Sequence, residues 1–196
     1  SATDQTIFSY IKLATNRLMH TVDAILNLSQ LNAGSLRLHP QKLNLSELVV
    51  STIQELKLSA NEKKLELGSE GTDQDIMVFA DEYSIQQALL NLTENAIKYT
   101  HAGSIQLKLE QQNDHVVLTI IDTGIGISEE NQERIFEPYT QESEGYTKKY
   151  QGIGLGLALT RQYLKLNHVT LILSSHKDVG STFTLTFPKI EDQAHG

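Results

Sequence analysis

The placement of glycine constrains this chain more than any other feature of its sequence. Six of the 12 glycines fall in three clusters within the C-terminal half, at Gly124 and Gly126, at Gly152, Gly154 and Gly156, and at Gly180. Glycine permits turns and close backbone approaches that a side chain would block. These clusters therefore mark the part of the chain in which functional residues are to be sought.

The charge and the cysteine content exclude several classes of protein. The 196 residues include no cysteine, which rules out disulfides and cysteine-ligated zinc and fits a reducing compartment. The formal net charge of −8 argues against a general nucleic-acid-binding protein, which needs a basic face. No apolar run approaches the ~18 residues of a membrane span. We expect a cytoplasmic chain without nucleic-acid or membrane contacts, whose longer parent could still carry an anchor.

Residues 1–34 are predicted to form one long helix and its C-terminal stop. Between Thr3 and Leu31 there is no glycine or proline. Apolar side chains recur there at spacings of three and four, at Ile7, Ile11, Ala14, Leu18, Val22, Ile25 and Leu28. A helix of this kind needs another helix to cover its apolar stripe, so we expect the chain to be cut from a larger protein.

The rest of the chain mixes helices and strands. Helices are predicted at 44–63, 82–100, 128–136 and 155–166, the first three opened by Asn44 (with Glu47), Asp81 and Ser128. Strands are predicted at 36–45 (interrupted near Pro40), 65–67, 76–79, 104–110, 116–121, 169–173 and 182–187, and a loop at 137–151. In the 44–63 helix, Leu48, Ile53, Leu56 and Leu58 are core candidates. Because helices and strands do not alternate regularly, an α+β fold with a mostly antiparallel sheet is favoured.

Asp122 directly follows an apolar strand and precedes two glycines. A carboxylate at the end of a strand can accept a hydrogen bond from an exocyclic amine. Gly124 and Gly126 allow the chain to turn close to a ligand. An ordinary glycine-rich turn after a strand has the same pattern, so this segment alone leaves both interpretations open.

Gly152, Gly154 and Gly156 lead into a predicted helix. Alternating glycines at that place expose backbone N–H groups at the positive end of the helix dipole, which suits a phosphate. No strand directly precedes the glycines and no Gly-Lys-Ser/Thr follows, so neither a Rossmann fingerprint nor a Walker A loop is present. A flexible hinge is the alternative interpretation.

The predicted helix 82–100 carries polar side chains on one face. Offsets of three and four residues align Asn91, Asn95 and the pair Lys98–Tyr99. These groups suit a nucleoside triphosphate with Mg²⁺, because an amide oxygen is a suitable ligand for a hard cation that keeps most of its waters. A merely solvated helix face is the alternative.

Five segments, in this order and spacing, resemble the motifs of sensor histidine kinases. Residues 91–100 resemble the N box, 122–126 the G1 box, 135–139 the F box, 152–157 the G2 box and 180–183 the final glycine motif. The resemblance covers residues 36–188 and implies a GHKL-type ATP-binding catalytic domain at 35–190, folded as a two-layer α/β sandwich. It makes residues 1–34 similar to the second helix of the dimerisation domain and leaves a tail at 191–196.

This resemblance implies ATP and Mg²⁺ as ligands. At the phosphate end, Asn95 is expected to ligate Mg²⁺ with Asn91 nearby, and Lys98 to approach the phosphates. Gly152, Gly154 and Gly156 are expected to admit the phosphates. Lys148 or Lys149, on an ATP lid formed by the 137–151 loop, is expected to reach the γ-phosphate. Asn91, Lys98, Lys148 and Lys149 make up the implied catalytic set.

At the base end, the resemblance assigns five residues. Asp122 is expected to accept from the adenine amine, and Thr182 to support adenine through water. Gly124 and Gly126 are expected to shape the pocket, and Tyr99 to lie against the nucleoside.

Members of the family transfer the γ-phosphoryl group to a histidine in a His-Glu/Asp-x-Arg context. None of the seven histidines has that context, and His20 is interpreted as a surface or packing residue of the first helix. The resemblance therefore implies a histidine protein kinase fragment that is inactive alone. Its parent is expected to be a homodimer that signals to the receiver domain of a response regulator.

GHKL enzymes that hydrolyse ATP, such as gyrase, place a glutamate one turn before the metal asparagine as a general base. Here Asn91 occupies that turn, and Glu94 projects about 100° away from Asn95 on the helix. Transfer to a protein side chain is therefore favoured over hydrolysis. Two alternatives stay open: a degenerate ATP-binding or scaffold module, and a GHKL-type ATPase or anti-sigma-like serine kinase.

Overall fold

The computed structural model describes residues 36–140 and 154–188, together with Thr15, Val22, Ile25, Leu26, Asn27 and Ser29. These six isolated positions are helical. Most of the helix predicted at 3–31, the greater part of the 137–151 loop and the tail at 191–196 lie outside the described residues, so those predictions stay predictions.

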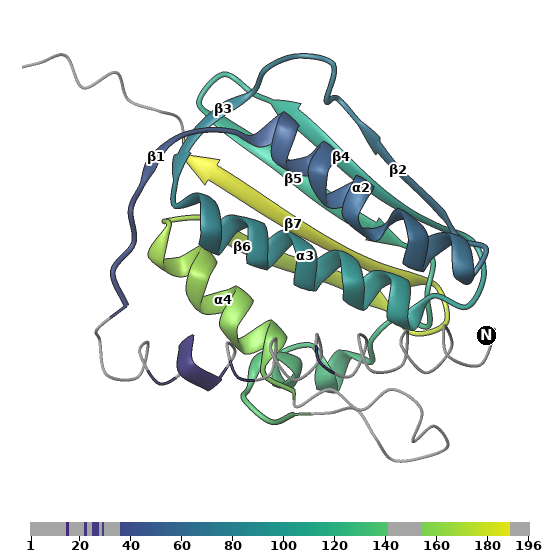
Figure 1. The fold of residues 1–196 in the computed structure, drawn as a ribbon. Coiled ribbons are helices and arrows are strands. Elements are labelled where there is room, and N and C mark those ends of the chain that lie inside the picture. Colours follow the sequence, from purple (N-terminus) through teal and green to yellow (C-terminus); the bar gives the residue numbers. More distant parts are fainter. Residues whose placement is uncertain are drawn as a thin grey trace, which may run out of the picture.

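The described part of the chain forms two layers. Its larger sheet contains β2 (Glu66–Glu70), β4 (Ser104–Gln111), β5 (His115–Asp122), β6 (Thr170–His176) and β7 (Gly180–Pro188). Helices α2 (Leu45–Glu62), α3 (Glu82–Tyr99) and α4 (Gly156–Leu166) cover one face of this sheet (Figure 1). The strand order is β2-β4-β5-β7-β6, with β2 parallel to β4 and every other pair antiparallel. The predicted α+β fold, a two-layer sandwich with a mixed and mostly antiparallel sheet, is confirmed.

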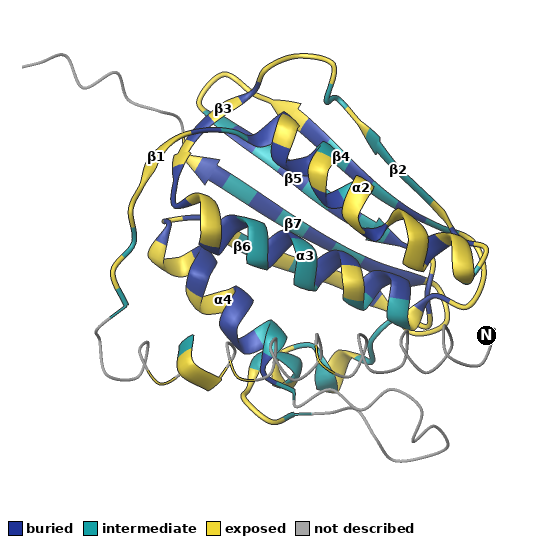
Figure 2. Ribbon diagram, viewed as in Figure 1, coloured by how far each residue is buried: buried dark blue, intermediate teal, exposed yellow. Residues whose placement is uncertain are grey.

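Alternation along the central strands decides which side chains face the helices. On β5, Leu118, Ile120 and Asp122 are buried, while the residues between them are half-buried. On β7, the buried positions include Ser181 and Leu185. Buried and half-buried residues alternate along both strands (Figure 2). Because successive side chains of a strand point to opposite faces, Asp122 and Ser181 lie on the same face as the core leucines.

The predicted start of α2 is confirmed. The side chain of Asn44 accepts a hydrogen bond from the backbone N–H of Glu47 at 3.3 Å, as an N-cap does. Leu48 and Leu56 are buried and Ile53 packs against the core, but the prediction for Leu58 was wrong, since its side chain is 70% exposed. Just before α2, the predicted strand shortens to β1 (Gln41–Asn44), which pairs with β3 (Met77–Ala80).

The prediction of a single helix at residues 128–136 was wrong. Residues 128–136 form two 3₁₀ turns, η1 (Glu129–Asn131) and η2 (Arg134–Phe136), instead of one helix. Ser128 makes no capping hydrogen bond, because its hydroxyl accepts from the side chain of Asn131 at 2.9 Å. Without that cap, three-residue turns take the place of a longer helix.

Helix α3 is fixed at its N-terminal end by buried hydrogen bonds. The carboxylate of Asp81 accepts from the N–H of Ser84 at 2.8 Å, which caps the helix, and from the N–H of His39 at 2.9 Å. Asn167, at the end of α4, accepts from the N–H of Asp81 at 2.7 Å and donates to the Ser84 hydroxyl at 2.8 Å. The start of α3 and the end of α4 are therefore joined through one buried amide.

The C-terminal end of α3 is held by a lysine from another element. The Lys63 ammonium, just after α2, donates to the carbonyl oxygens of Ile97 at 2.7 Å and Lys98 at 2.8 Å. These carbonyls belong to the last turn of α3, where a cation interacts favourably with the helix dipole. Both ends of α3 are thus anchored outside the helix.

None of the described helices combines the length and the apolar character that crossing a membrane requires.

The Asp81 cap generates a stability prediction. Burial alone raises the pKa of Asp81, but hydrogen bonds from His39 and Ser84 and the charge of His39 outweigh it and hold the pKa below its ordinary value. Such a carboxylate stabilises the fold above the pKa of the unfolded chain, and this contribution is lost as pH falls through the folded-state pKa. Asp81→Ala is expected to lower the unfolding free energy by about 1–2 kcal/mol at pH 7.

Urea unfolding at pH 7 and at steps below about pH 4 measures this effect, because the difference from wild type should shrink in the acidic range. Asp73→Ala is the matched control, since Asp73 is exposed and the charge change is the same. An equal loss in both variants would contradict the assignment of Asp81.

Candidate functional site

Asp122 lies at the end of β5 with one carboxylate oxygen occupied and the other available. Oδ1 accepts from the N–H of Gly124 at 2.8 Å and from the N–H of Ser181 at 3.3 Å. Oδ2 accepts no hydrogen bond from the described residues. The side chain is buried, with the residue 8% exposed. A buried acceptor of this kind favours a ligand that donates a hydrogen bond.

Burial has an electrostatic consequence at this position. It raises the pKa of Asp122, and the hydrogen bonds from Gly124 and Ser181 only partly oppose the rise. The ionised carboxylate is therefore held in an environment less favourable than water. Perturbed carboxylates of this kind cluster at binding and catalytic sites.

The turn after Asp122 requires glycine because of its neighbours. Gly126 has φ +64°, and a Cβ at this position would lie 1.9 Å from the carbonyl oxygen of His176. The Ile127 N–H donates to the hydroxyl of Ser175 at 2.8 Å, and this hydroxyl lies 3.0 Å from that of Ser181. The glycine turn therefore rests directly on the β6–β7 hairpin.

Strand β7 pairs with β5 beside Asp122, and Thr182 was predicted to support adenine from this strand. Ser181 pairs with Asp122 across the ladder, whereas Thr182 pairs with Ile121. Thr182 consequently lies on the other face of the sheet from the Asp122 carboxylate. Ser181 is the neighbour of Asp122, and the period-two alternation after Gly180 is the sequence signal that could have identified it.

The polar face of α3 leads from the glycine turn toward α4. The carbonyl of Tyr99 accepts from the N–H of Ile125 at 3.2 Å, which joins the end of α3 to the turn. Tyr99 is 45% exposed, and the ammonium of Lys98 lies 4.8 Å from the centre of its ring. Asn95 is half-buried, and its side chain makes no hydrogen bond with the described residues.

Asn91 lies where α3 contacts α4. Its amide nitrogen donates to the hydroxyl of Thr160 at 2.8 Å. Its amide oxygen is directed at Gly156, where an added Cβ would lie 2.2 Å away. Gly156 therefore lets the first turn of α4 approach α3. Leu155, at the N-cap of α4, makes no side-chain capping hydrogen bond, so the N–H groups of the half-buried first turn have no side-chain cap and suit an anion.

The structure thus brings most of the predicted site residues together along the C-terminal half of α3. Asp122, Gly124 and Gly126 lie at its end, and Gly156 lies beside Asn91. Gly154, with φ +74°, comes just before α4. Gly152, Lys148 and Lys149 lie outside the described residues.

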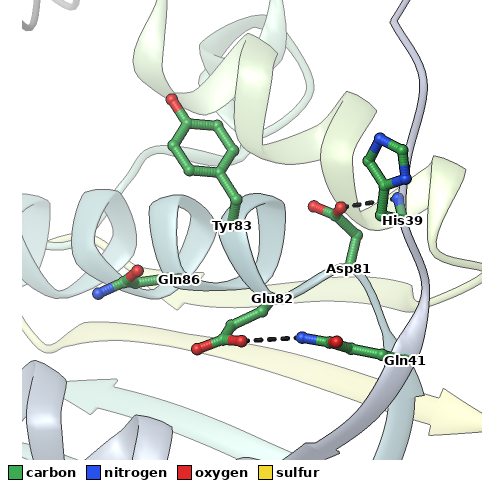
Figure 3. Close-up of a pocket in the computed structure, with 6 residues that line it drawn as sticks. All are labelled: His39, Gln41, Asp81, Glu82, Tyr83 and Gln86. Carbon is green, nitrogen blue, oxygen red and sulfur yellow. Dashed lines mark hydrogen bonds between the residues drawn. The ribbon is translucent and has the colours of Figure 1, made fainter.

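A surface pocket of about 310 Å³ lies at the other, N-terminal, end of α3 (Figure 3). Its lining comprises His39, Gln41, Asp81, Glu82, Tyr83 and Gln86. The two carboxylates are already engaged, since Asp81 caps α3 and Glu82 accepts from the Gln41 amide at 2.9 Å. We therefore assign this pocket a structural role.

A buried acceptor beside a glycine turn, a polar helix face and an uncapped helix start define a nucleotide-binding class of site. Residues 80–191 match the family described as histidine kinase-, DNA gyrase B-, and HSP90-like ATPases. This match covers more than half of the chain, so the chain belongs to that family.

Curated relatives are similar over most of this chain. The circadian input-output histidine kinase CikA of Synechococcus elongatus is 34% identical over 175 residues, which are 88% of this chain and 23% of that protein. The autoinducer 2 sensor kinase/phosphatase LuxQ of Vibrio cholerae is 35% identical over 176 residues, covering 87% and 20%. The heme sensor protein HssS of Staphylococcus saprophyticus is 35% identical over 177 residues, covering 90% and 37%. The chain thus spans well under half of these relatives.

Solved structures share the fold. Full-length ShkA in complex with AMPPNP matches with a TM-score of 0.79 and 24% identity, over 96% of this chain and 39% of that one. The Acinetobacter baumannii histidine kinase AdeS matches with a TM-score of 0.75 and 24% identity, over 95% and 85%. The nucleotide-free catalytic domain of the histidine kinase ThkA matches with a TM-score of 0.67 and 28% identity, over 78% and 97%. The resemblance to histidine kinase catalytic domains is therefore confirmed, and this is an ATP-binding domain of that type.

The contact between Gly156 and Asn91 generates a packing prediction. Gly156→Ala is expected to lower the unfolding free energy by about 1 kcal/mol, because the added methyl group overlaps the Asn91 amide and displaces it from its hydrogen bond with Thr160. Alanine would otherwise stabilise a helix by about 1 kcal/mol relative to glycine. Urea unfolding measures the change.

The double variant Gly156→Ala with Asn91→Ala tests the cause, since removing the amide should recover part of the loss. Gly68→Ala is a control, because a Cβ there would meet only the end of the Gln106 side chain, at 3.1 Å. Strictly additive effects of the two substitutions would contradict the proposed contact.

Proposed function

We propose that this chain is the ATP-binding catalytic part of a sensor histidine kinase, supplying Mg-ATP for phosphoryl transfer to a histidine outside the chain. In this proposal residues 35–190 bind ATP, residues 1–34 correspond to the second helix of a dimerisation domain, and 191–196 are a tail. The parent protein would be a homodimer that passes the phosphoryl group to a response regulator receiver domain in the cytoplasm.

One observation carries the proposal: the unpaired Oδ2 of the buried Asp122. The 6-amino group of adenine is a donor that can satisfy this oxygen, and the carboxylate that carries it is only 8% exposed as a residue. Ser181 supports the carboxylate from β7, and we assign it the role first expected of Thr182. Gly124 and Gly126 let the turn pack closely against the end of α3 and the β6–β7 hairpin, which holds the chain beside the proposed base site.

The phosphates would extend from the base along α3. Asn91 and Tyr99 are eight residues apart, which corresponds to about 12 Å along the helix. A nucleotide lying over this half of α3 would place its ribose near Tyr99 and its phosphates near Lys98. The uncapped first turn of α4, with Gly154 and Gly156, supports an anion there. We propose that Gly152 and Lys148 or Lys149 contribute from the lid segment.

Asn95 is the residue we propose as the protein ligand of Mg²⁺. Across residues 36–140 and 154–188, no three His, Asp or Glu side chains gather as a metal site. Mg²⁺ usually keeps several waters and takes one or two protein ligands together with substrate phosphates. The uncommitted amide oxygen of Asn95 fits that requirement. Bound Mg²⁺ would offset negative charge on the phosphates.

Transfer to a side chain is favoured over hydrolysis by the groups around the phosphates. Asn91 stands one turn before Asn95, and its amide is committed to Thr160. An amide cannot act as a general base for water. Glu94 is exposed on α3. We therefore propose a kinase fragment that hydrolyses ATP slowly and depends on a separate phosphoacceptor histidine, instead of an ATPase.

Calorimetric titration with ATP, in Mg²⁺ and then in EDTA, tests the proposal. We expect binding that weakens without Mg²⁺, and Asn95→Ala is expected to remove this metal dependence because Asn95 is the proposed protein ligand of the ion. Asn61→Ala, an exposed asparagine on α2, is the matched control. Absence of ATP binding in the wild type would support the scaffold alternative, and rapid hydrolysis the ATPase alternative.

Asp122→Asn separates binding from folding. The asparagine Oδ1 can keep both hydrogen bonds from Gly124 and Ser181, but an amide nitrogen replaces the acceptor offered to adenine. A carboxyl group with a raised folded-state pKa lowers stability once pH passes the unfolded-state pKa, so the variant should be as stable as wild type or more stable at pH 7.

At pH values below the unfolded-state pKa, the stability difference should disappear. ATP affinity should fall at least tenfold, since an acceptor is replaced by a donor that opposes the amine. Calorimetry and urea unfolding measure the two effects, and unchanged ATP affinity would remove Asp122 from the site.

A further inference from the structure

The hydroxyl of Thr100 is a buried polar group without a hydrogen-bond partner. Thr100 is 0% exposed, and none of the described residues provides a partner for Oγ1. The residue forms the C-cap of α3, and its N–H donates to the Ala96 carbonyl at 3.0 Å. The backbone at this position is therefore satisfied and only the side-chain hydroxyl is not.

This hydroxyl lies at the base end of the site. A Cβ added to Gly124 would lie 2.9 Å from Oγ1 of Thr100, 2.8 Å from Oδ1 of Asp122 and 2.7 Å from the carbonyl oxygen of Tyr99. Three oxygens thus surround one side of Gly124. Two of them are acceptors only, and the Thr100 hydroxyl is the one of the three that carries a proton to donate.

Leaving a buried hydroxyl unpaired lowers stability, and an apolar side chain of the same shape would avoid the loss. Valine has that shape. The hydroxyl and the Asp122 carboxylate flank the same side of Gly124, so a small movement of either group on ligand binding would give the hydroxyl a use that valine could not have.

We propose that Thr100 is a positioning residue for Asp122 that sets the preference of the pocket for 6-aminopurines over 6-oxopurines. This role rests on the proposed function. When a base covers Asp122 it removes the remaining water from the carboxylate. The Thr100 hydroxyl then donates to the carboxylate in place of that water and fixes its orientation.

Discrimination between 6-amino and 6-oxo bases follows from the protonation state of the Asp122 carboxylate. An ionised carboxylate only accepts hydrogen bonds, so it pairs with a 6-amino group and opposes a 6-oxo group. A protonated carboxyl group could donate to a 6-oxo group instead. A donor at Thr100 favours the ionised form and therefore the amino base. Without this donor, desolvation by the base would weaken binding of ATP more than binding of inosine triphosphate.

The test uses Thr100→Val, which keeps the shape and loses the hydroxyl, and Thr100→Ser, which keeps the hydroxyl and loses a methyl group. Calorimetry gives the Kd of each variant for ATP and for inosine triphosphate. We expect Thr100→Val to raise the Kd for ATP about tenfold and to reduce the preference for ATP over inosine triphosphate. Thr100→Ser should stay near wild type in both quantities.

Urea unfolding accompanies the titrations, and Thr100→Val is expected to be at least as stable as wild type. Thr100→Ala, which also lacks the hydroxyl, provides a second binding measurement should valine impair folding. ATP binding by Thr100→Val equal to wild type, or a loss confined to Thr100→Ser, would overturn the role and indicate packing alone. Failure of wild type to bind ATP would instead overturn the proposed function and this role with it.

Discussion

Helix α3 has to be held at both ends by groups outside it, because it serves two purposes. One face packs its apolar side chains into the core, and the other carries the polar groups of the site. Asp81 and Asn167 secure the N-terminal end, and Lys63 secures the C-terminal carbonyls. With both ends fixed, the Asn95 side chain can remain without a hydrogen bond, and the Lys98 ammonium without an ion pair, among the described residues, as a binding surface requires.

The base end of the site follows the same division between support and function. One oxygen of Asp122 is used to hold the glycine turn and β7, and the other is left for a ligand. Burial makes this arrangement unfavourable for the free protein, as the raised pKa of Asp122 indicates. Strained or destabilised groups of this kind are common where activity requires them, so stability and nucleotide binding should respond in opposite directions at Asp122.

Features that depend on neighbours in sequence could be predicted from the sequence, and features that depend on distant neighbours could not. The caps at Asn44 and Asp81 involve residues three positions away, and strands β4 and β5 show clear apolar patterns, so both were predicted. The choice between Ser181 and Thr182 depends on the pairing of β7 with β5. The role of Lys63 was missed because its partner Ile97 lies 34 residues away along the chain. The role of Asn167 was missed because its partner Ser84 lies 83 residues away.

The most direct test of the account is a crystal structure of this chain with Mg²⁺ and a non-hydrolysable ATP analogue. The account predicts the 6-amino group within hydrogen-bond distance of Oδ2 of Asp122, with the phosphates over the half of α3 that carries Asn95 and Lys98. A base bound away from Asp122, or a nucleotide bound only in the pocket lined by His39 and Tyr83, would contradict it.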